Sequence, residues 1–198
     1  MEQKLLTTNQ LDALKEVFNM GAGNATTSLS SMLGKIVRMS VPSVNVKELN
    51  SIIEEVGEDE VVGIVVRVLG DIPGNVLIIF DYKAAVDMIS SFIGGVEKVS
   101  EMGKSVMSEV GNILSTSYMS AVSKFTHLVI RPSVPAVACD MFSSILSTTV
   151  LESGQYDKYI LDIETIFKDE KNQNLGAHFY YVPVPGAIEK LLKTIGVK

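Results

Sequence analysis

The sequence predicts an internally duplicated α/β fold, with a mixed sheet covered by helices and two halves related by a pseudo-two-fold axis. Three observations predict it: a motif that occurs twice, Val/Ile-rich segments that are apolar on both faces, and two long segments with helical apolar spacing. We expect one domain over residues 1–198, built from repeats at about 9–96 and 102–197, because no Pro/Gly/Ser-rich linker separates the halves.

The duplicated motif is Glu-Val-x-Asn, written "EVFN" at 16–19 and "EVGN" at 109–112. Each copy is followed at the same distance by "SVP", at 40–42 and at 133–135. When 12–44 is aligned with 105–137, nine of the 33 positions are identical, where average composition gives about two by chance. The two halves therefore derive from one repeated unit.

In each half, the sequence pattern predicts a long helix, then extended segments, and then a short helix at the end. The long helices run from about Asn9 to Leu33 and from about Ser105 to Phe125, where apolar residues keep helical spacing. Residues 60–80 predict a hairpin with its turn at 71–74, and 74–80 and 176–182 predict equivalent strands. The charged stretch 168–174 predicts a hairpin tip in the second half.

Composition excludes several classes of function. A net charge of −6 without a block of Lys and Arg argues against nucleic acid, and no apolar run approaches the ~20 residues of a membrane span. One cysteine allows no internal disulfide and suits a reducing cytoplasm, where we expect the protein. With two histidines and no His/Cys cluster, we expect no metal site and no cofactor on this chain.

The motif residues share one face of each long helix. Glu16 and Asn19, like Glu109 and Asn112, are at i and i+3, and they lie largely off the apolar stripe, so they face solvent. An exposed carboxylate can pair with a cation of a partner, and an exposed carboxamide can orient a water. A single such pair is common on solvated helices, and a duplication also preserves structural residues, so repetition alone does not prove catalysis.

Four further positions of the repeat predict structural roles. Asp12 and Ser105 lie one turn before each Glu, and both residue types are common N-caps, so we interpret them as helix starts. Pro42 and Pro135 end the two "SVP" tripeptides, and we expect each to fix the chain where it enters a strand.

Two other patterns each allow a structural and a functional interpretation. The small residues of "GAGN" at 21–24 predict a close approach of two helices rather than a phosphate-binding loop, because no strand precedes them. Asp162 and Glu164 alternate within "YILDIETIF", which puts both carboxylates on one face of a strand and hints only weakly at acid–base chemistry.

The doubled spacing of Asp/Ser, Glu, Asn and Pro resembles the CheC family of chemotaxis phosphatases, and "GAGNAT" (21–26) and "GDIPGNVLII" (70–79) are also similar to that family. The related CheX proteins resemble one copy of the site, and the FliY switch proteins resemble this core with flanking segments. The resemblance implies hydrolysis of the phosphoaspartate of the response regulator CheY. It implies that Glu16 and Glu109 pair with a regulator lysine, that Asn19 and Asn112 orient the attacking water, and that Mg²⁺ resides on the regulator.

The resemblance also implies a second partner, the receptor deamidase CheD. The segment 138–146 is the candidate surface, where Asp140 either begins a short helix that binds the partner or merely caps it. The alternative to an enzyme is a non-catalytic adaptor that binds phosphorylated CheY and regulates CheD. One position departs from the family pattern: a small residue such as Gly111 is usual between Glu and Asn, but the first copy has Phe18. Its spacing with Leu14 and Ala22 favours the core over the docking face.

Overall fold

The computed structural model describes residues 6–152, 159–168 and 177–196. The first half contains α1 (Thr8–Leu33), β1 (Arg38–Glu48), α2 (Leu49–Val56), β2 (Glu60–Gly70), β3 (Gly74–Asp81) and α3 (Tyr82–Ile93). The second half contains α4 (Glu101–Thr126), β4 (Ile130–Pro132), β5 (Ala136–Met141), α5 (Phe142–Glu152), β6 (Tyr159–Lys168), β7 (Ala177–Pro183) and α6 (Ala187–Thr194). The expected hairpin tip at 168–174 lies almost entirely outside the described residues.

The strands form one seven-stranded sheet that interleaves the halves. Its order is β1-β6-β7-β3-β2-β4, and β5 also pairs with β2. The counterparts in the two halves are β1 with β4 and β5, β2 with β6, and β3 with β7. When each strand is exchanged for its counterpart, the order reads in reverse and the pairings stay the same. This is the pattern of a pseudo-two-fold axis between β7 and β3. The α/β class and the repeated pattern are thus confirmed. Every pairing of the described strands is antiparallel, so the expectation of a mixed sheet is wrong.

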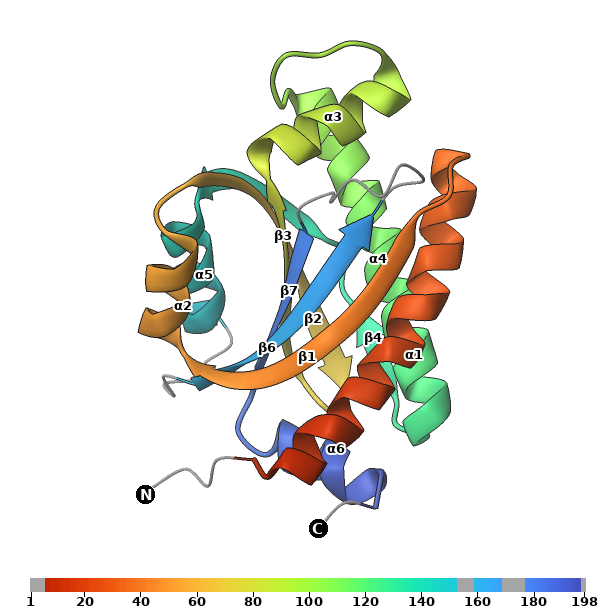
Figure 1. Ribbon diagram of the computed structural model, residues 1–198, viewed down its shortest axis with the longest axis vertical. Coiled ribbons are helices and arrows are strands. Elements are labelled where there is room, and N and C mark those ends of the chain that lie inside the picture. The colour runs from red at the N-terminus through yellow and green to blue at the C-terminus, as the bar shows by residue number, and fades with distance from the viewer. Residues whose placement is uncertain (1–5, 153–158, 169–176, 197–198) are drawn as a thin grey trace.

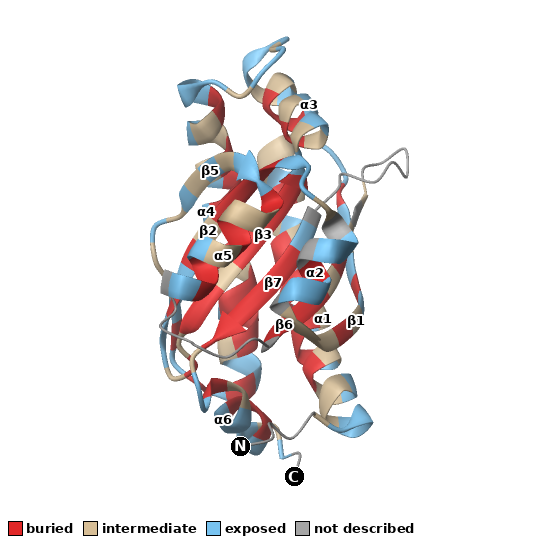
Figure 2. Ribbon diagram, turned by 90° about the vertical axis from the view of Figure 1, so that its left-hand side faces the viewer, coloured by how far each residue is buried: buried red, intermediate tan, exposed pale blue. Residues whose placement is uncertain are grey.

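Helices cover both faces of this sheet. The long helices α1 and α4 lie side by side on one face and run in opposite directions, while α3 and α6 lie at the two ends (Figure 1). The shorter α2 and α5 cover the other face, and most of the sheet between the two layers is buried (Figure 2). The larger core lies under α1 and α4 and includes Leu14, Leu29, Met107, Leu114, Ile64 and Phe80. A smaller core under α2 and α5 includes Ile52, Phe142, Leu146, Leu77 and Ile79.

The contact between the long helices depends on small residues, as "GAGN" predicts. A Cβ at Gly21 would lie 3.0 Å from Cγ of Tyr118, so glycine lets the tyrosine ring pack against the α1 backbone. Further along, the hydroxyl of Ser117 donates to that of Ser28 at 2.8 Å. The helices are therefore in contact at Gly21, two residues after Asn19, and at Tyr118, six residues after Asn112.

The long helices begin earlier than the motif suggests. The N-cap of α1 is Thr7, in a capping box with Gln10, and the N-cap of α4 is Ser100, whose hydroxyl accepts from the Gly103 amide. The interpretation of Asp12 and Ser105 as N-caps is therefore wrong, because both lie inside the helices on exposed positions. Thr7 and Ser100 are themselves 93 residues apart, so the caps belong to the same duplication.

Candidate functional site

The two Glu-x-x-Asn motifs occupy separate places on the paired helices. Both lie in the N-terminal half of their helix, and the helices are antiparallel, so the motifs point toward opposite ends of the pair (Figure 1). The helices contact each other at Gly21 with Tyr118 and at Ser28 with Ser117. At a rise of 1.5 Å per residue along each helix from these contacts, Glu16 and Glu109 lie roughly 25 Å apart. Each copy must therefore act by itself, and the two carboxylates do not share one site.

In the second copy, the motif side chains are free for a partner. Glu109 and Asn112 are both exposed on adjacent turns of α4. Across the described parts of the chain, neither side chain has a hydrogen-bond or ion-pair partner; only the backbone carbonyl of Asn112 accepts, from the hydroxyl of Ser115 at 3.3 Å. The Asn112 carboxamide keeps both donors and its acceptor available.

In the first copy, the asparagine is already occupied. The Asn19 Nδ2 donates to the carbonyl of Val41 at 3.0 Å, and the Val41 amide donates to Asn19 Oδ1 at 2.9 Å. Val41 lies at a β-bulge, where the register of β1 against β6 shifts between Ser40 and Ser43, and it is 1% exposed. Bulged residues lose their ladder partners, so Asn19 satisfies two buried backbone groups that β6 does not reach. This pairing explains the 22-residue spacing from Asn to the Val of "SVP" in the first copy.

The second "SVP" adopts another arrangement. Residues 133–135 separate β4 from β5, and Val134, the counterpart of Val41, is 85% exposed. Ser133 pairs with Arg67 of β2 instead: its amide donates to the Arg67 carbonyl at 2.8 Å, and its hydroxyl accepts from the Arg67 amide at 2.9 Å. Water can reach the Val134 backbone, so Asn112 is not needed there. Pro135 lies directly before β5, as expected. Pro42 lies inside β1 at the bulge, so the expectation that it marks the entry to a strand is wrong; the bulge interrupts the ladder there and accommodates a residue without an amide hydrogen.

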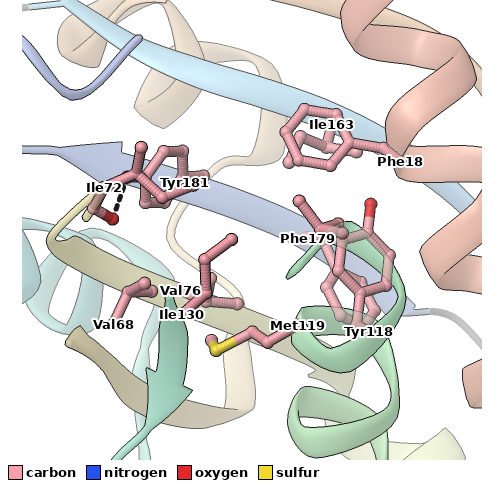
Figure 3. Close-up of a pocket in the computed structure, with 11 residues that line it drawn as sticks. Phe18, Val68, Ile72, Val76, Tyr118, Met119, Ile130, Ile163, Phe179 and Tyr181 are labelled. Atoms are coloured by element: carbon pink, nitrogen blue, oxygen red, sulfur yellow. Dashed lines mark hydrogen bonds between the residues drawn. The ribbon is translucent and has the colours of Figure 1, made fainter. Parts of the chain in front are cut away.

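The residue directly before Asn in each motif, Phe18 or Gly111, faces the interior of the protein. Phe18 is 5% exposed and stacks on Tyr118 of α4, with ring centroids 5.8 Å apart, and Tyr118 stacks in turn on Phe179 of β7 at 5.8 Å. These rings line a wholly apolar cavity of about 40 Å³ between the helices and the sheet (Figure 3). The interpretation of Phe18 as a core residue is confirmed, so it does not obstruct a partner at Glu16.

At the equivalent position of α4, Gly111 lets the helix lie directly on β2. A Cβ there would lie 2.5 Å from Cγ2 of Ile64, which is fully buried. We expect Gly111→Ala to lower the free energy of unfolding by about 1–3 kcal/mol through overpacking, measured by urea denaturation. Gly23→Ala on α1 is the matched control, because its Cβ meets nothing within 4 Å and helical Gly→Ala is stabilising. Equal stability of the two variants would contradict this packing.

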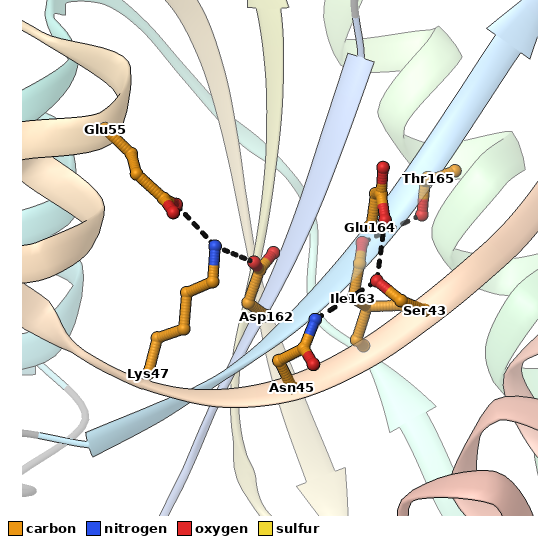
Figure 4. Close-up of polar contacts among 8 residues, drawn as sticks. All are labelled: Ser43, Asn45, Lys47, Glu55, Asp162, Ile163, Glu164 and Thr165. Carbon is orange, nitrogen blue, oxygen red and sulfur yellow. Dashed lines mark hydrogen bonds and ion pairs between the residues drawn. The ribbon is translucent and has the colours of Figure 1, made fainter.

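The carboxylates of β6 are engaged in structural contacts. Asp162 is 7% exposed and pairs with Lys47 of β1 at 3.0 Å, and the same ammonium contacts Glu55 of α2 (Figure 4). Glu164 accepts a hydrogen bond from the Ser43 hydroxyl at 2.6 Å. Burial raises the pKa of the Asp162 carboxyl, although Lys47 acts to lower it. These contacts favour a structural role over acid–base chemistry.

Removing Lys47 tests this assignment. Because burial raises the Asp162 pKa above its unfolded value, ionisation of this group opposes folding, and its contribution to stability declines as pH rises through the folded pKa. Lys47→Ala removes the compensating charge, so we expect a loss of about 1–3 kcal/mol at pH 8 and a smaller loss at pH 5, by urea denaturation. Lys104→Ala, which breaks only an exposed pair with Glu101, should change stability little at either pH. A pH-independent loss for Lys47→Ala would contradict the assignment.

The remaining candidate, Asp140, does not begin or cap a helix. It lies in the edge strand β5, two residues before α5 begins at Phe142, and its Oδ1 accepts from the Met141 amide at 2.7 Å. Within the described ranges, no group of three or more His, Cys, Asp or Glu is placed to hold a metal ion. No helix in those ranges is long and apolar enough to cross a membrane.

Known proteins are similar to this chain over both motif copies. The profile of the CheC-like family matches residues 10–46 and 102–139, which contain the two motif copies in turn. A Bacillus subtilis protein named CheY-P phosphatase CheC is 32% identical over 196 residues, covering 94% of each chain. The chain belongs to the CheC-like family. CheC1 of Halobacterium salinarum is 24% identical over 96% of this chain and 98% of its own.

Solved structures of two other proteins share the fold. FliY of Thermotoga maritima superposes with a TM-score of 0.81 at 21% identity, over 97% of this chain and 98% of that one. A CheX protein of Desulfovibrio desulfuricans superposes with a TM-score of 0.58 at 16% identity, over 85% of this chain and 99% of that one. At these identities the likeness concerns the fold alone.

Proposed function

We propose that this protein dephosphorylates the phosphoaspartate of the chemotaxis response regulator CheY, chiefly through Glu109 and Asn112. The observation that carries the proposal is the exposed Asn112 carboxamide, which has no partner among the described residues and lies one turn from the exposed Glu109. Both are on a helix that packs directly against β2 at Gly111. The name of the Bacillus subtilis relative, a CheY-P phosphatase, supports it.

The chemistry asks little of this chain. Phosphoryl transfer requires positioning and charge neutralisation, and the regulator supplies the phosphoaspartate and holds the Mg²⁺. Glu109 pairs with a lysine of the regulator and so sets the orientation of docking. The carboxamide of Asn112 accepts a hydrogen bond from a water and holds it in line with the phosphorus, which recovers part of the positional entropy of attack. The water oxygen forms a bond to phosphorus as the bond from phosphorus to the aspartate oxygen breaks. The aspartate leaves as a carboxylate, and the protons of the water go to inorganic phosphate and to solvent.

The first copy has a different status in this proposal. Glu16 is exposed and can pair with a lysine in the same way, but Asn19 must release Val41 before it can orient a water. Release would leave two buried backbone groups without partners, at about 1–3 kcal/mol each. The first copy therefore contributes docking more readily than turnover.

The decay of phosphorylated CheY, with and without this protein, tests the proposal. Acceleration by the wild type supports an enzyme. Binding of phosphorylated CheY without acceleration would instead make the chain an adaptor, and the regulation of CheD would then become its main activity. Within the enzyme reading, Glu109→Ala should weaken regulator binding more than Asn112→Ala does, because it removes an ion-pair partner; equal affinities in a titration would refute the assigned roles.

A further inference from the structure

A positively charged patch with exposed apolar side chains lies at the end of the sheet where β2 meets β4. Leu69 pairs with Arg131, and the ladder extends on either side through Asp71 with Val129 and Arg67 with Ser133, each by an amide-to-carbonyl bond of 2.8 Å. Residues opposite one another in an antiparallel ladder share a face, as do alternate residues of a strand.

The three opposed pairs of this ladder consequently lie on the face away from α1 and α4, Asp71 and Ser133 included. We name the other four residues the arginine patch: Arg67, Leu69, Val129 and Arg131. The alternate residues Val68 and Ile130 point the other way, into the main core. Asn75, opposite Arg67 on β3, donates from Nδ2 to the Thr149 carbonyl of α5 at 3.1 Å, so the patch adjoins the end of that helix.

The patch is open to solvent. Leu69 is 45% exposed and Val129 is 53% exposed, and both arginines are exposed. Within the described part of the chain, neither guanidinium has a hydrogen-bond or ion-pair partner. The neighbouring carboxylate of Asp71 is committed elsewhere, to the Lys190 ammonium and to the Val129 amide. A chain of net charge −6 therefore presents a local positive surplus here.

The residue types identify the chemistry of an occupant. Arg67 and Arg131 are diagonal neighbours across the ladder, within reach of one ligand, and guanidinium groups bind carboxylates through two parallel hydrogen bonds. The adjoining side chains of Leu69 and Val129 would be buried favourably by apolar side chains of the occupant. Two cations are too few for nucleic acid, whose affinity accumulates over many phosphates. They are also too few for a membrane surface, where each adds about 1 kcal/mol.

We propose that the arginine patch docks a short segment of a protein partner that carries carboxylates beside apolar side chains. Charge complementarity selects the acidic segment, and the exposed leucine and valine select one with apolar residues. Because Val68 and Ile130 enter the main core under α1 and α4, the patch lies on the opposite face from the helices that bear Glu16 and Glu109. Such a partner and a response regulator can therefore bind at the same time.

A peptide titration tests the proposal. The probe is a peptide with alternating pairs of Glu and Leu, added to the ¹⁵N-labelled full chain and followed by amide chemical shifts. We expect the shifts to concentrate at residues 67–69 and 129–131, and the double variant Arg67→Ser/Arg131→Ser to bind at least about tenfold more weakly. The matched control is Arg38→Ser, which removes the counterpart of Arg131 in the other half and should leave binding unchanged.

Each opposite outcome overturns the proposal. Undiminished binding by the double variant, with the wild-type thermal midpoint, would show that the arginines are not the site. Equal binding of a peptide with Glu and Ser pairs would show that Leu69 and Val129 take no part. Tighter binding of single-stranded RNA or of phosphatidylserine vesicles at the same residues would replace the protein partner by another class.

Discussion

Replacing Asn112 by alanine is expected to reduce the acceleration of CheY dephosphorylation by roughly 30- to 1000-fold, equivalent to about 2–4 kcal/mol of transition-state stabilisation. The side chain has no partner among the described residues, so the thermal midpoint of unfolding should stay at the wild-type value. The decay of phosphorylated CheY at saturating protein measures the turnover, and a binding titration separates it from affinity.

Thr116→Ala provides the control for this variant, because Thr116 is exposed one turn further along the same face of α4. It should leave the rate of decay unchanged. Wild-type turnover by Asn112→Ala would contradict the water-orienting role, and a common loss in both variants would indicate that the helix face merely docks the regulator.

Replacing Asn19 by alanine should instead destabilise the fold. The change removes both hydrogen bonds to Val41 and leaves its amide and carbonyl buried without partners, which costs about 2–6 kcal/mol in total. Urea denaturation measures the loss, and hydrogen exchange at the Val41 amide should become faster. Turnover should fall much less than it does in Asn112→Ala.

Asn19→Asp refines this test. The carboxylate can still accept from the Val41 amide but cannot donate to the Val41 carbonyl, so this variant should also be less stable than the wild type. If Asn19→Ala kept wild-type stability and lost turnover as Asn112→Ala does, both copies would be equivalent catalytic sites. The hydrogen bonds to Val41 would then contribute nothing measurable to the stability of the fold.

Local patterns in the sequence predicted most elements, but not the partners of the strands. Helical spacing located the two long helices, and Asp71 to Gly74 located the β2–β3 turn, because both signals are contained in a few residues. A strand's neighbour is decided by burial of the whole sheet. The pairing of β1 with β6, and hence an antiparallel rather than a mixed sheet, therefore had no local signal.

The sequence identified the two Glu-x-x-Asn motifs as candidates but not the structural difference between them. The spacing from each Asn to "SVP" is the same in both copies, but in the structure Asn19 is hydrogen-bonded to Val41 while Val134 is exposed. The N-caps Thr7 and Ser100 lie five residues before Asp12 and Ser105, outside the part of the repeat with the identical residues. A capping role depends on where the chain turns into the helix, which residue type alone does not predict.

The interleaved order of the sheet also has a consequence for biosynthesis. Glu48 pairs with Tyr159 and Arg38 with Lys168. During synthesis, β1 therefore cannot pair with β6 until more than a hundred further residues have left the ribosome. Contacts this distant in sequence delay folding, and the first half must meanwhile carry an unpaired strand with an apolar face. Synthesis of the first half alone should therefore yield a chain that aggregates or pairs with a second copy of itself, and maturation should begin only when the second half has emerged.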